Sequence, residues 1–188
     1  CEKAGFVLDK DGVLQVQSAL EQLIYNTMEE LVAKKLHGAA KKDMDYLLRR
    51  KSDLAAIVYM YRLKQMTGAD RAYLLPRLAA GYSNMSQKQL LYLMDAADCE
   101  DFVHRLARTP YAREFFGSSF TRVEDAVQRL DYRWHLKKLC FSTDPSVVPF
   151  CYIFLAENEL TNPTHIIQGV RYHMPPAKIA PLLVGVGA

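Results

Sequence analysis

The chain has 188 residues, of which 50% are hydrophobic and 24% are charged, and this balance is typical of a folded globular protein and excludes a disordered one. Leucine and alanine, with 24 and 20 copies, outnumber valine and isoleucine, with 13 and 6, so the composition favours helices and argues against an all-β fold. The net charge of +3 is too small to require nucleic acid as a partner.

Nothing in the sequence marks an export signal or a membrane span. The four cysteines Cys1, Cys99, Cys140 and Cys151 lack Cys-x-x-Cys spacing and predict reduced thiols of a cytosolic protein. The longest strongly apolar run, residues 147–156, covers ten residues, about half of what a membrane span needs. We therefore expect membrane contact only through a partner protein. Because the chain begins at Cys1 rather than Met, we also expect an upstream portion.

Two long helical patterns open the chain. Apolar residues from Val16 to Leu31 recur three and four positions apart, and Gly38 supplies a stop signal for this first helix. The second pattern runs from about residue 41 to residue 66 and ends at Gly68.

Shorter helices follow, and capping signals mark their starts. Ser86 and Gln89 form a capping box, as do Thr121 and Glu124. Proline next to a cap position predicts three further starts, at Thr109-Pro110, Asp144-Pro145 and Pro175-Pro176. No stretch alternates with a period of two over a length that would make a strand. The sequence therefore predicts an all-α fold with short connections between helices.

A weak internal repeat suggests how the chain is divided. Residues 53–78 resemble residues 159–184, which lie 106 positions further on. Each copy has an acidic residue followed by Leu, an apolar helix that carries Arg, a break and a short apolar helix. We therefore predict two related helical domains, residues 40–117 and residues 118–188, after a helical lead-in over residues 1–39.

Known catalytic and metal-binding patterns are missing from the sequence. Asp9, Asp11 and Gly12 resemble part of a calcium loop, but Ser18 stands where the loop requires a bidentate Glu. The five histidines never occur at the spacing of a helical zinc site, and nucleotide-binding glycine motifs and the serine elbow do not occur. We therefore expect no cofactor, no metal ion and no catalytic residue, and a helical enzyme is the weakest of the alternatives.

Glu157 and Glu159 follow the longest apolar run directly. Two carboxylates this close could serve general acid and base catalysis. They could equally be the charged end of a helix at an interface. The sequence leaves both interpretations open.

The chain carries charged segments of opposite sign. Residues 34–51 hold seven cations and two aspartates, a composition that fits either a solvated helix face or a nucleic-acid surface, and the solvated face is the simpler interpretation. Acidic residues gather around a predicted helix start at Asp95, Asp98, Glu100 and Asp101. Patches of both signs on one small chain favour docking to proteins over binding to nucleic acid.

Two stretches resemble the central-stalk subunit of V-type and A-type rotary ATPases, which is named C in archaeal and bacterial complexes and d in eukaryotic ones. In residues 152–179 the shared features are an Ile-rich helix together with Glu159, Asn162, Gly169, Arg171 and Met174-Pro175-Pro176. In residues 53–68 they are Asp53, Ile57, Arg62, Lys64 and Gly68, followed by Thr109 and Tyr111. The chain departs from the family pattern at Ala56, where the family usually has Asn, and at Pro163.

The resemblance implies a fold and a role. The family consists of three similar helical domains that form a funnel, and this chain would hold the second and third with part of the first. It would be a non-catalytic, peripheral adaptor on the cytoplasmic face of a membrane, coupling the axle to the rotor ring for ATP-linked proton or sodium transport. Its partners would be the axle subunits and the ring, without nucleic acid, and the isolated chain would form a homodimer through exposed apolar surface.

The resemblance also implies interface candidates, which are Arg62, Lys64, Glu159, Asn162 and Arg171. Each has a second interpretation as a residue that pairs helices within the body, and Asn162 also as a turn or capping residue. The alternative function is a helical nucleic-acid-associated module that uses residues 34–51, whose binding would weaken steeply with salt.

Overall fold

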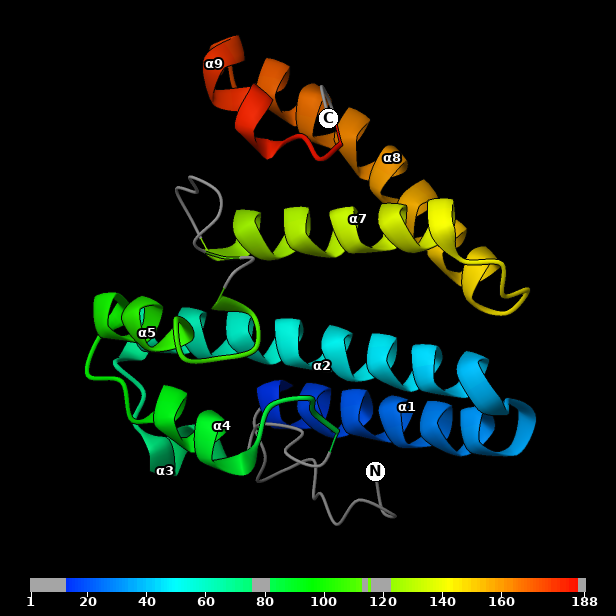
Figure 1. Ribbon diagram of the computed structural model, residues 1–188. Coiled ribbons are helices and arrows are strands. Elements are labelled where there is room, and N and C mark those ends of the chain that lie inside the picture. Colours follow the sequence, from blue (N-terminus) through cyan, green and yellow to red (C-terminus); the bar gives the residue numbers. More distant parts are fainter. Residues whose placement is uncertain (1–12, 76–81, 113–114, 116–122, 186–188) are drawn as a thin grey trace. The chain divides into compact units, whose positions relative to one another are not determined.

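The computed structural model describes residues 13–75, 82–112, 115 and 123–185, and Figure 1 shows its helices in sequence colours. The described residues contain helices and no strand, which confirms the predicted all-α fold class. The chain falls into two compact units, residues 1–116 and residues 117–188. The three-part division expected from the sequence, with boundaries after residues 39 and 117, stays a prediction.

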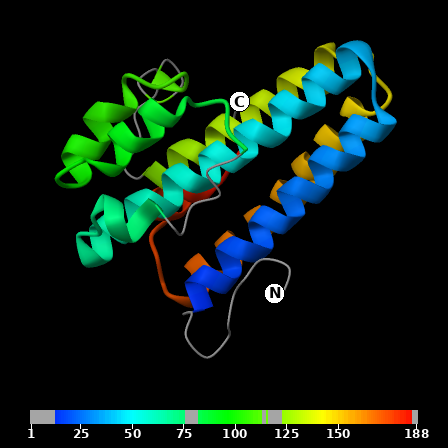
Figure 2. The same ribbon diagram turned by 90° about the horizontal axis from the view of Figure 1, so that it is seen from below.

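The first unit begins with a long helical hairpin. Helix α1 spans Val13–Lys35 and helix α2 spans Gly38–Thr67, and the two lie side by side in opposite directions (Figures 1 and 2). Gly38 has a φ of +60°, a left-handed conformation that glycine adopts at little cost, so it lets the chain reverse. Gly38 is thus the first residue of α2, which begins slightly earlier than the periodicity predicts because Ala39 and Ala40 favour helix.

Among the described helices of this unit, α2 contributes the largest number of buried apolar side chains. Its buried face packs against helix α5, which spans Cys99–Leu106. Gly68 caps α2 in a left-handed conformation and donates its N–H to the carbonyl of Lys64, which confirms the predicted end. The buried apolar side chains of α2 are Met44, Leu47, Leu48, Leu54, Ile57, Met60 and Leu63.

Two more short helices complete the described part of the first unit. Helix α3 spans Arg71–Leu74 and helix α4 spans Gln87–Met94, and α4 contacts both α3 and α5. The predicted capping box at the start of α4 is confirmed, because Ser86 and Gln89 each bond the backbone N–H of the other. The helix predicted to start at Thr109-Pro110 would run into residues 113–114 and 116–122, which lie outside the described residues.

The second unit is built on an antiparallel pair of long helices. Helix α7 spans Val123–Phe141 and helix α8 spans Val147–Arg171. Asp144 confirms the predicted start of α8, since its Oδ1 accepts hydrogen bonds from the backbone N–H groups of Ser146 at 2.8 Å and Val147 at 3.3 Å. The capping box predicted at Thr121 lies outside the described residues. The core side chains of this pair are Val123, Ala126, Leu130, His135, Val147, Cys151 and Leu155.

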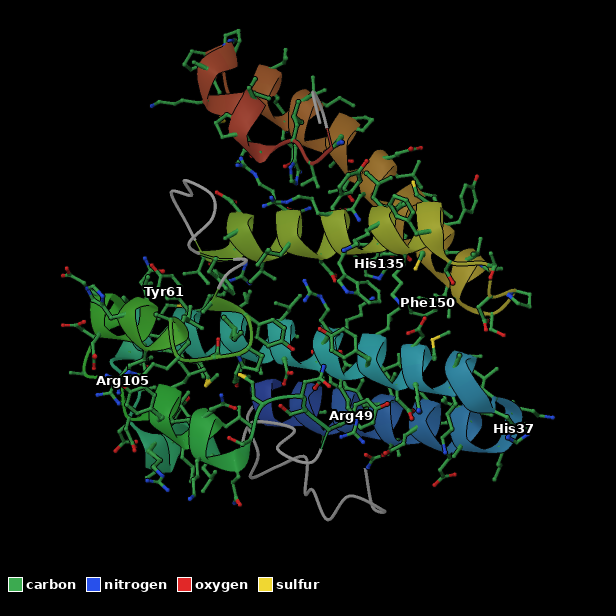
Figure 3. The ribbon with its side chains drawn as sticks, in the orientation of Figure 1. His37, Arg49, Tyr61, Arg105, His135 and Phe150 are labelled. Carbon is green, nitrogen blue, oxygen red and sulfur yellow. The ribbon has the colours of Figure 1, made fainter. Side chains whose placement is uncertain are left out.

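His135 lies inside the second unit as a core residue. Its ring stacks on Phe154 with 3.9 Å between centroids. The centre of the Phe150 ring lies 6.4 Å away, and Figure 3 labels His135 and Phe150. Its Nδ1 is 2.7 Å from the backbone carbonyl oxygen of Asp131. The sequence favoured surface or half-buried histidines, and His135 differs because it is 1% exposed and packs as a core residue.

The chain folds back on α8 after a defined helix end. The N–H of His173 bonds the carbonyl of Val170 and the N–H of Met174 bonds the carbonyl of Gly169, the pattern of a Schellman motif with His173 at a φ of +52°. Helix α9 then spans Pro176–Ile179, with proline at its first position as predicted, and a 3₁₀ turn covers Ala180–Leu182.

Candidate functional site

A buried carboxylate joins the two sequence motifs of the first unit. Asp53, on α2, accepts a hydrogen bond from the hydroxyl of Tyr111 at 2.6 Å, one from the backbone N–H of Asn84 at 2.9 Å and one from the hydroxyl of Ser83. Burial raises the pKa of Asp53, and these hydrogen bonds act in the opposite direction. The guanidinium of Arg50 lies 5.5 Å from the centre of the Tyr111 ring. The motif residue Asp53 therefore organises the interior of the unit.

Lys64 directs its ammonium group into the first unit. Its Nζ donates hydrogen bonds to the backbone carbonyls of Ala96 at 2.7 Å and Ala69 at 3.0 Å. Burial is the main cause that lowers the pKa of Lys64, and the positive charge of Arg105 acts in the same direction. Lys64 thus ties the end of α2 to the turn between α4 and α5, which is the within-body interpretation of this candidate.

Arg62 lies on the opposite side of α2 from the buried face. Its side chain is exposed, as is Met66 one turn later. The core residues Met60 and Leu63 precede and follow it. Arg62 therefore borders a surface of the first unit rather than its core.

Helix α8 has an exposed apolar row on the side away from its core. Ile153, Leu160 and Ile167 follow one another at intervals of seven residues and are 59%, 75% and 66% exposed. Seven residues are close to two helical turns, so the three side chains lie along one line. Arg171 is exposed one turn beyond Ile167 and continues the same line. We call these four residues the α8 row.

The interpretation of Glu157 and Glu159 as a charged helix end is wrong, because α8 continues without a break to Arg171 and passes through Pro163. Residues two apart on a helix point to different sides, so the two carboxylates do not form an acid–base pair either. Both are exposed. Glu159 lies at one edge of the exposed face that the α8 row occupies.

Asn162 lies on the inner side of α8 and holds the end of the described chain. Its Nδ2 donates to the carbonyl of Val184 at 2.8 Å, and its Oδ1 accepts from the N–H of Val184 at 3.0 Å. The Nδ1 atom of His165 lies 3.1 Å from the carbonyl of Leu182, and Arg129 donates to the carbonyl of Pro181 at 2.8 Å. The side-chain amide of Asn162 thus pairs with both the N–H and the C=O of Val184, in the way that a backbone amide pairs with another.

The basic segment over residues 34–51 does not form one continuous cationic surface. Arg49 pairs with Glu29 at 3.4 Å and lies over the ring of Tyr82 at 4.9 Å. Arg50 is buried. Three lysines near the start of the segment are exposed instead, namely Lys34, Lys35 and Lys42. This division weakens the nucleic-acid alternative, which requires the segment as a whole.

Within the parts of the chain that the structure describes, no group of three or more His, Cys, Asp or Glu side chains converges where it could hold a metal ion. None of the described helices combines the length and the hydropathy that a membrane span requires. Residues 9–12, where the sequence resembles part of a calcium loop, lie outside the described residues.

The sequence predicts exposed apolar surface but does not indicate where on the chain it lies. The stripe along α1 fits the helical spacing of a core face, yet Leu20, Leu23, Ile24 and Leu31 are exposed. The α8 row was hidden in the same way, because apolar residues occur on every side of that helix. The interval of seven residues from Ile153 to Ile167 was the signal in the sequence that could have identified it.

Comparison with known proteins identifies the family. The model of the ATP synthase (C/AC39) subunit family matches residues 6–182. Searches of curated proteins and of solved structures found no match. The family match covers both units and both stretches on which the resemblance was based, including the Asp53 motif and the end of α8. The chain belongs to the ATP synthase C/AC39 subunit family, a family of structural subunits of membrane-associated V-type and A-type ATPases.

Proposed function

We propose that this chain is a non-catalytic adaptor of a rotary ATPase, which couples the central axle to the membrane rotor ring during ATP-linked proton or sodium transport. It acts as a peripheral protein on the cytoplasmic face of the membrane, and axle and ring subunits are its partners. The observation that carries the proposal is the family match over residues 6–182. The exposed faces of long helices supply the surfaces that such a role requires.

An adaptor that transmits torque has to resist bending. The 30 residues of α2 and the 25 residues of α8 form single helices, and each packs its inner face against neighbouring helices. Helices gain most of their stability from such packing. The internal bonds of Lys64 and Asn162 fix the ends of these elements, so we assign to both residues the task of keeping the docking surfaces in shape.

Direct contacts come from exposed residues. The α8 row offers apolar side chains that end in a cation at Arg171, and Glu159 lies at its edge. A protein partner would bury the apolar side chains at the centre of the contact and leave the charges at its rim. Arg62 provides a separate contact on the first unit.

The test is a pull-down of the tagged chain from detergent-solubilised membranes of the source organism, with identification of the bound proteins. We expect the wild-type chain to recover axle and ring subunits, and Leu160→Asp, Glu159→Lys and Arg62→Glu to recover less. Phe141→Asp is the matched control for the apolar change, since Phe141 is 81% exposed outside the α8 row, and Lys137→Glu is the control for charge.

Recovery of no ATPase subunit by the wild-type chain would overturn the proposal. Equal losses in the variants and in their controls would show that the named surfaces are not the contacts. Circular dichroism of every variant would exclude unfolding as the cause of a loss.

The same exposed surface leads us to propose that the isolated chain forms a homodimer. Monomeric proteins rarely leave large apolar patches open. Light scattering during gel filtration should give twice the chain mass for the wild type and a single mass for Leu160→Asp. A monomeric wild-type chain would contradict this part of the proposal.

A further inference from the structure

One end of the α1–α2 hairpin is strongly cationic. Lys34 and Lys35 end α1, His37 lies in the connection, and Lys41 and Lys42 belong to the first turns of α2. All are exposed except Lys41, which is half-buried. Figure 3 labels His37 at this end of the hairpin. We call these five residues the cationic tip.

The cationic tip has no acidic partner among the residues that the structure describes. None of its side chains takes part in a salt bridge or hydrogen bond there, whereas Arg49, Arg71 and Arg105 each pair with a carboxylate. Residues 34–42 contain four lysines and no acidic residue. The charges of the tip are therefore available to a partner.

Part of this charge is costly in the free protein, because Lys41 and Lys42 lie at the start of α2. Lys34 and Lys35 instead end α1, where the helix dipole favours cations. The start of α2 has no side-chain cap at His37 and no acidic residue in its first turn. Cations at the N-terminal end of a helix face the positive end of its dipole, which is unfavourable. An anionic partner bound at the tip would instead interact favourably with the positive end of the α2 dipole.

Exposed apolar side chains lead directly into the tip. Leu31 is 53% exposed and precedes Lys34 and Lys35 by three and four positions, so the three share one face of α1. Met28 is exposed one turn earlier. When this face of α1 lies along a membrane surface, its lysines reach the charged headgroups and its apolar side chains reach the acyl boundary just beneath them.

A nucleic-acid surface would have a different composition. Proteins that bind single strands stack bases on aromatic side chains between their cations, and residues 34–42 contain no Phe, Tyr or Trp. An acidic protein surface would also match the lysines, whereas a membrane surface offers both a dense array of anionic headgroups and a continuous apolar layer to Leu31. The combination of lysines with Leu31 therefore favours lipid.

We propose that the cationic tip, together with Leu31, binds the anionic phospholipid headgroups of a membrane surface directly. This goes beyond the proposed function, in which the chain meets the membrane only through the rotor ring. Each lysine near an anionic surface strengthens binding roughly fivefold, so the tip alone binds weakly. Assembly in a membrane complex would hold it close to lipid and make weak contacts effective.

The experiment is sedimentation of the purified full chain with vesicles of phosphatidylcholine alone or with about 30% phosphatidylserine. The test variant replaces Lys34, Lys35 and Lys42 with Gln. A matched control replaces the exposed Lys88, Lys137 and Lys178 with Gln and so removes the same charge elsewhere. Leu31→Gln tests the apolar contribution, and circular dichroism checks the fold of each variant.

We expect binding only to vesicles that contain phosphatidylserine, a loss of at least about tenfold in the tip variant, a smaller loss in Leu31→Gln and little change in the control. Binding should also fall between about 100 mM and 500 mM salt. Equal binding to both vesicles, or equal losses in the tip variant and the control, would overturn the proposal.

Tighter binding to a single-stranded oligonucleotide or to polyglutamate than to the anionic vesicles would also overturn it, in favour of a nucleic acid or an acidic protein as the partner. Failure here is distinguishable from failure of the proposed function. Loss of vesicle binding leaves the recovery of ATPase subunits from detergent unchanged, because that assay contains no bilayer.

Discussion

Tyr111 donates its hydroxyl hydrogen to Oδ2 of Asp53 across 2.6 Å, joining residues that lie 58 positions apart in the sequence. Both side chains are buried, and the bond links the middle of α2 to the segment after α5. The two motifs of the first unit that resemble the ATPase family thus meet in one hydrogen bond. This hydrogen bond gives a structural reason for finding both motifs in one sequence.

Tyr111→Phe removes this bond and leaves the ring in place. Because the acceptor is a buried carboxylate, we expect the free energy of unfolding to fall by about 2 kcal/mol. Urea unfolding followed by circular dichroism measures the change. Tyr172→Phe is the control, since Tyr172 is 71% exposed and its hydroxyl should contribute little. Equal effects of the two changes would contradict the role of the Asp53 bond.

The buried carboxyl of Asp53 predicts a dependence on pH. Its pKa in the folded chain is raised above the ordinary value of 3.8, mainly by burial. The folded chain therefore holds this proton more tightly than the unfolded chain, so the stability that comes from the shift is present below the unfolded pKa and is lost as pH rises through the folded pKa. Asp53→Asn lacks this titration.

We therefore expect the stability of the wild type, relative to Asp53→Asn, to decrease as pH rises from about 4. Urea unfolding of both proteins between about pH 3 and pH 7 gives this difference directly. Subtracting the variant cancels the titration of the other carboxyl groups. A difference that increases with pH would show that the pKa of Asp53 is lowered instead.

Asn162→Ala should loosen the fold-back after α8. The change removes both hydrogen bonds to Val184, which is 5% exposed, and leaves that backbone position to find other partners. We expect a loss of about 2 kcal/mol in the stability of the second unit. Thr164→Ala provides the control on the exposed side of the same helix. Hydrogen exchange at Val184 should increase in Asn162→Ala and stay unchanged in the control.

The effect of Gly169→Ala on stability depends on the neighbouring side chain of Ile179. A Cβ atom at this position would lie 2.6 Å from Cγ1 and Cδ1 of Ile179. Alanine favours a helix over glycine by about 1 kcal/mol, but displacing Ile179 costs about 1 to 3 kcal/mol. We expect Gly169→Ala to destabilise the wild type and to stabilise the Ile179→Ala variant.

Thermal unfolding of the four proteins of this double-mutant cycle measures the coupling. A Gly169→Ala effect of the same sign in both backgrounds would mean that α9 moves away from α8 without cost, and the close packing of these helices would then not contribute to stability.

Local chemistry explains which elements could be predicted from the sequence. The capping box at Ser86 and Gln89, the stop at Gly68 and the proline start at Pro176 depend on residues within one turn of each other. Such signals are complete in a short stretch of sequence. All three occur in the structure where they were expected.

Other features depend on parts of the chain that only folding brings together. The burial of Lys64 follows from its bond to Ala96, 32 positions away, and a lysine in the sequence looks the same whether it points inward or outward. The continuation of α8 through Pro163 depends on packing against α7 that outweighs the cost of an interior proline. Exposed apolar rows resemble core faces until the neighbours of a helix are known.

The spacing of the α8 row sets a requirement on whatever covers it. The apolar part of the row runs from Ile153 to Ile167, which are 14 positions apart, so it extends roughly 21 Å along the helix. A single inserted side chain or a tight turn would leave most of it in water, whereas one helix of about four turns would cover it. Photo-crosslinkers placed at these two positions should therefore capture one partner at two points separated by about four turns, which would reveal the direction in which that partner runs.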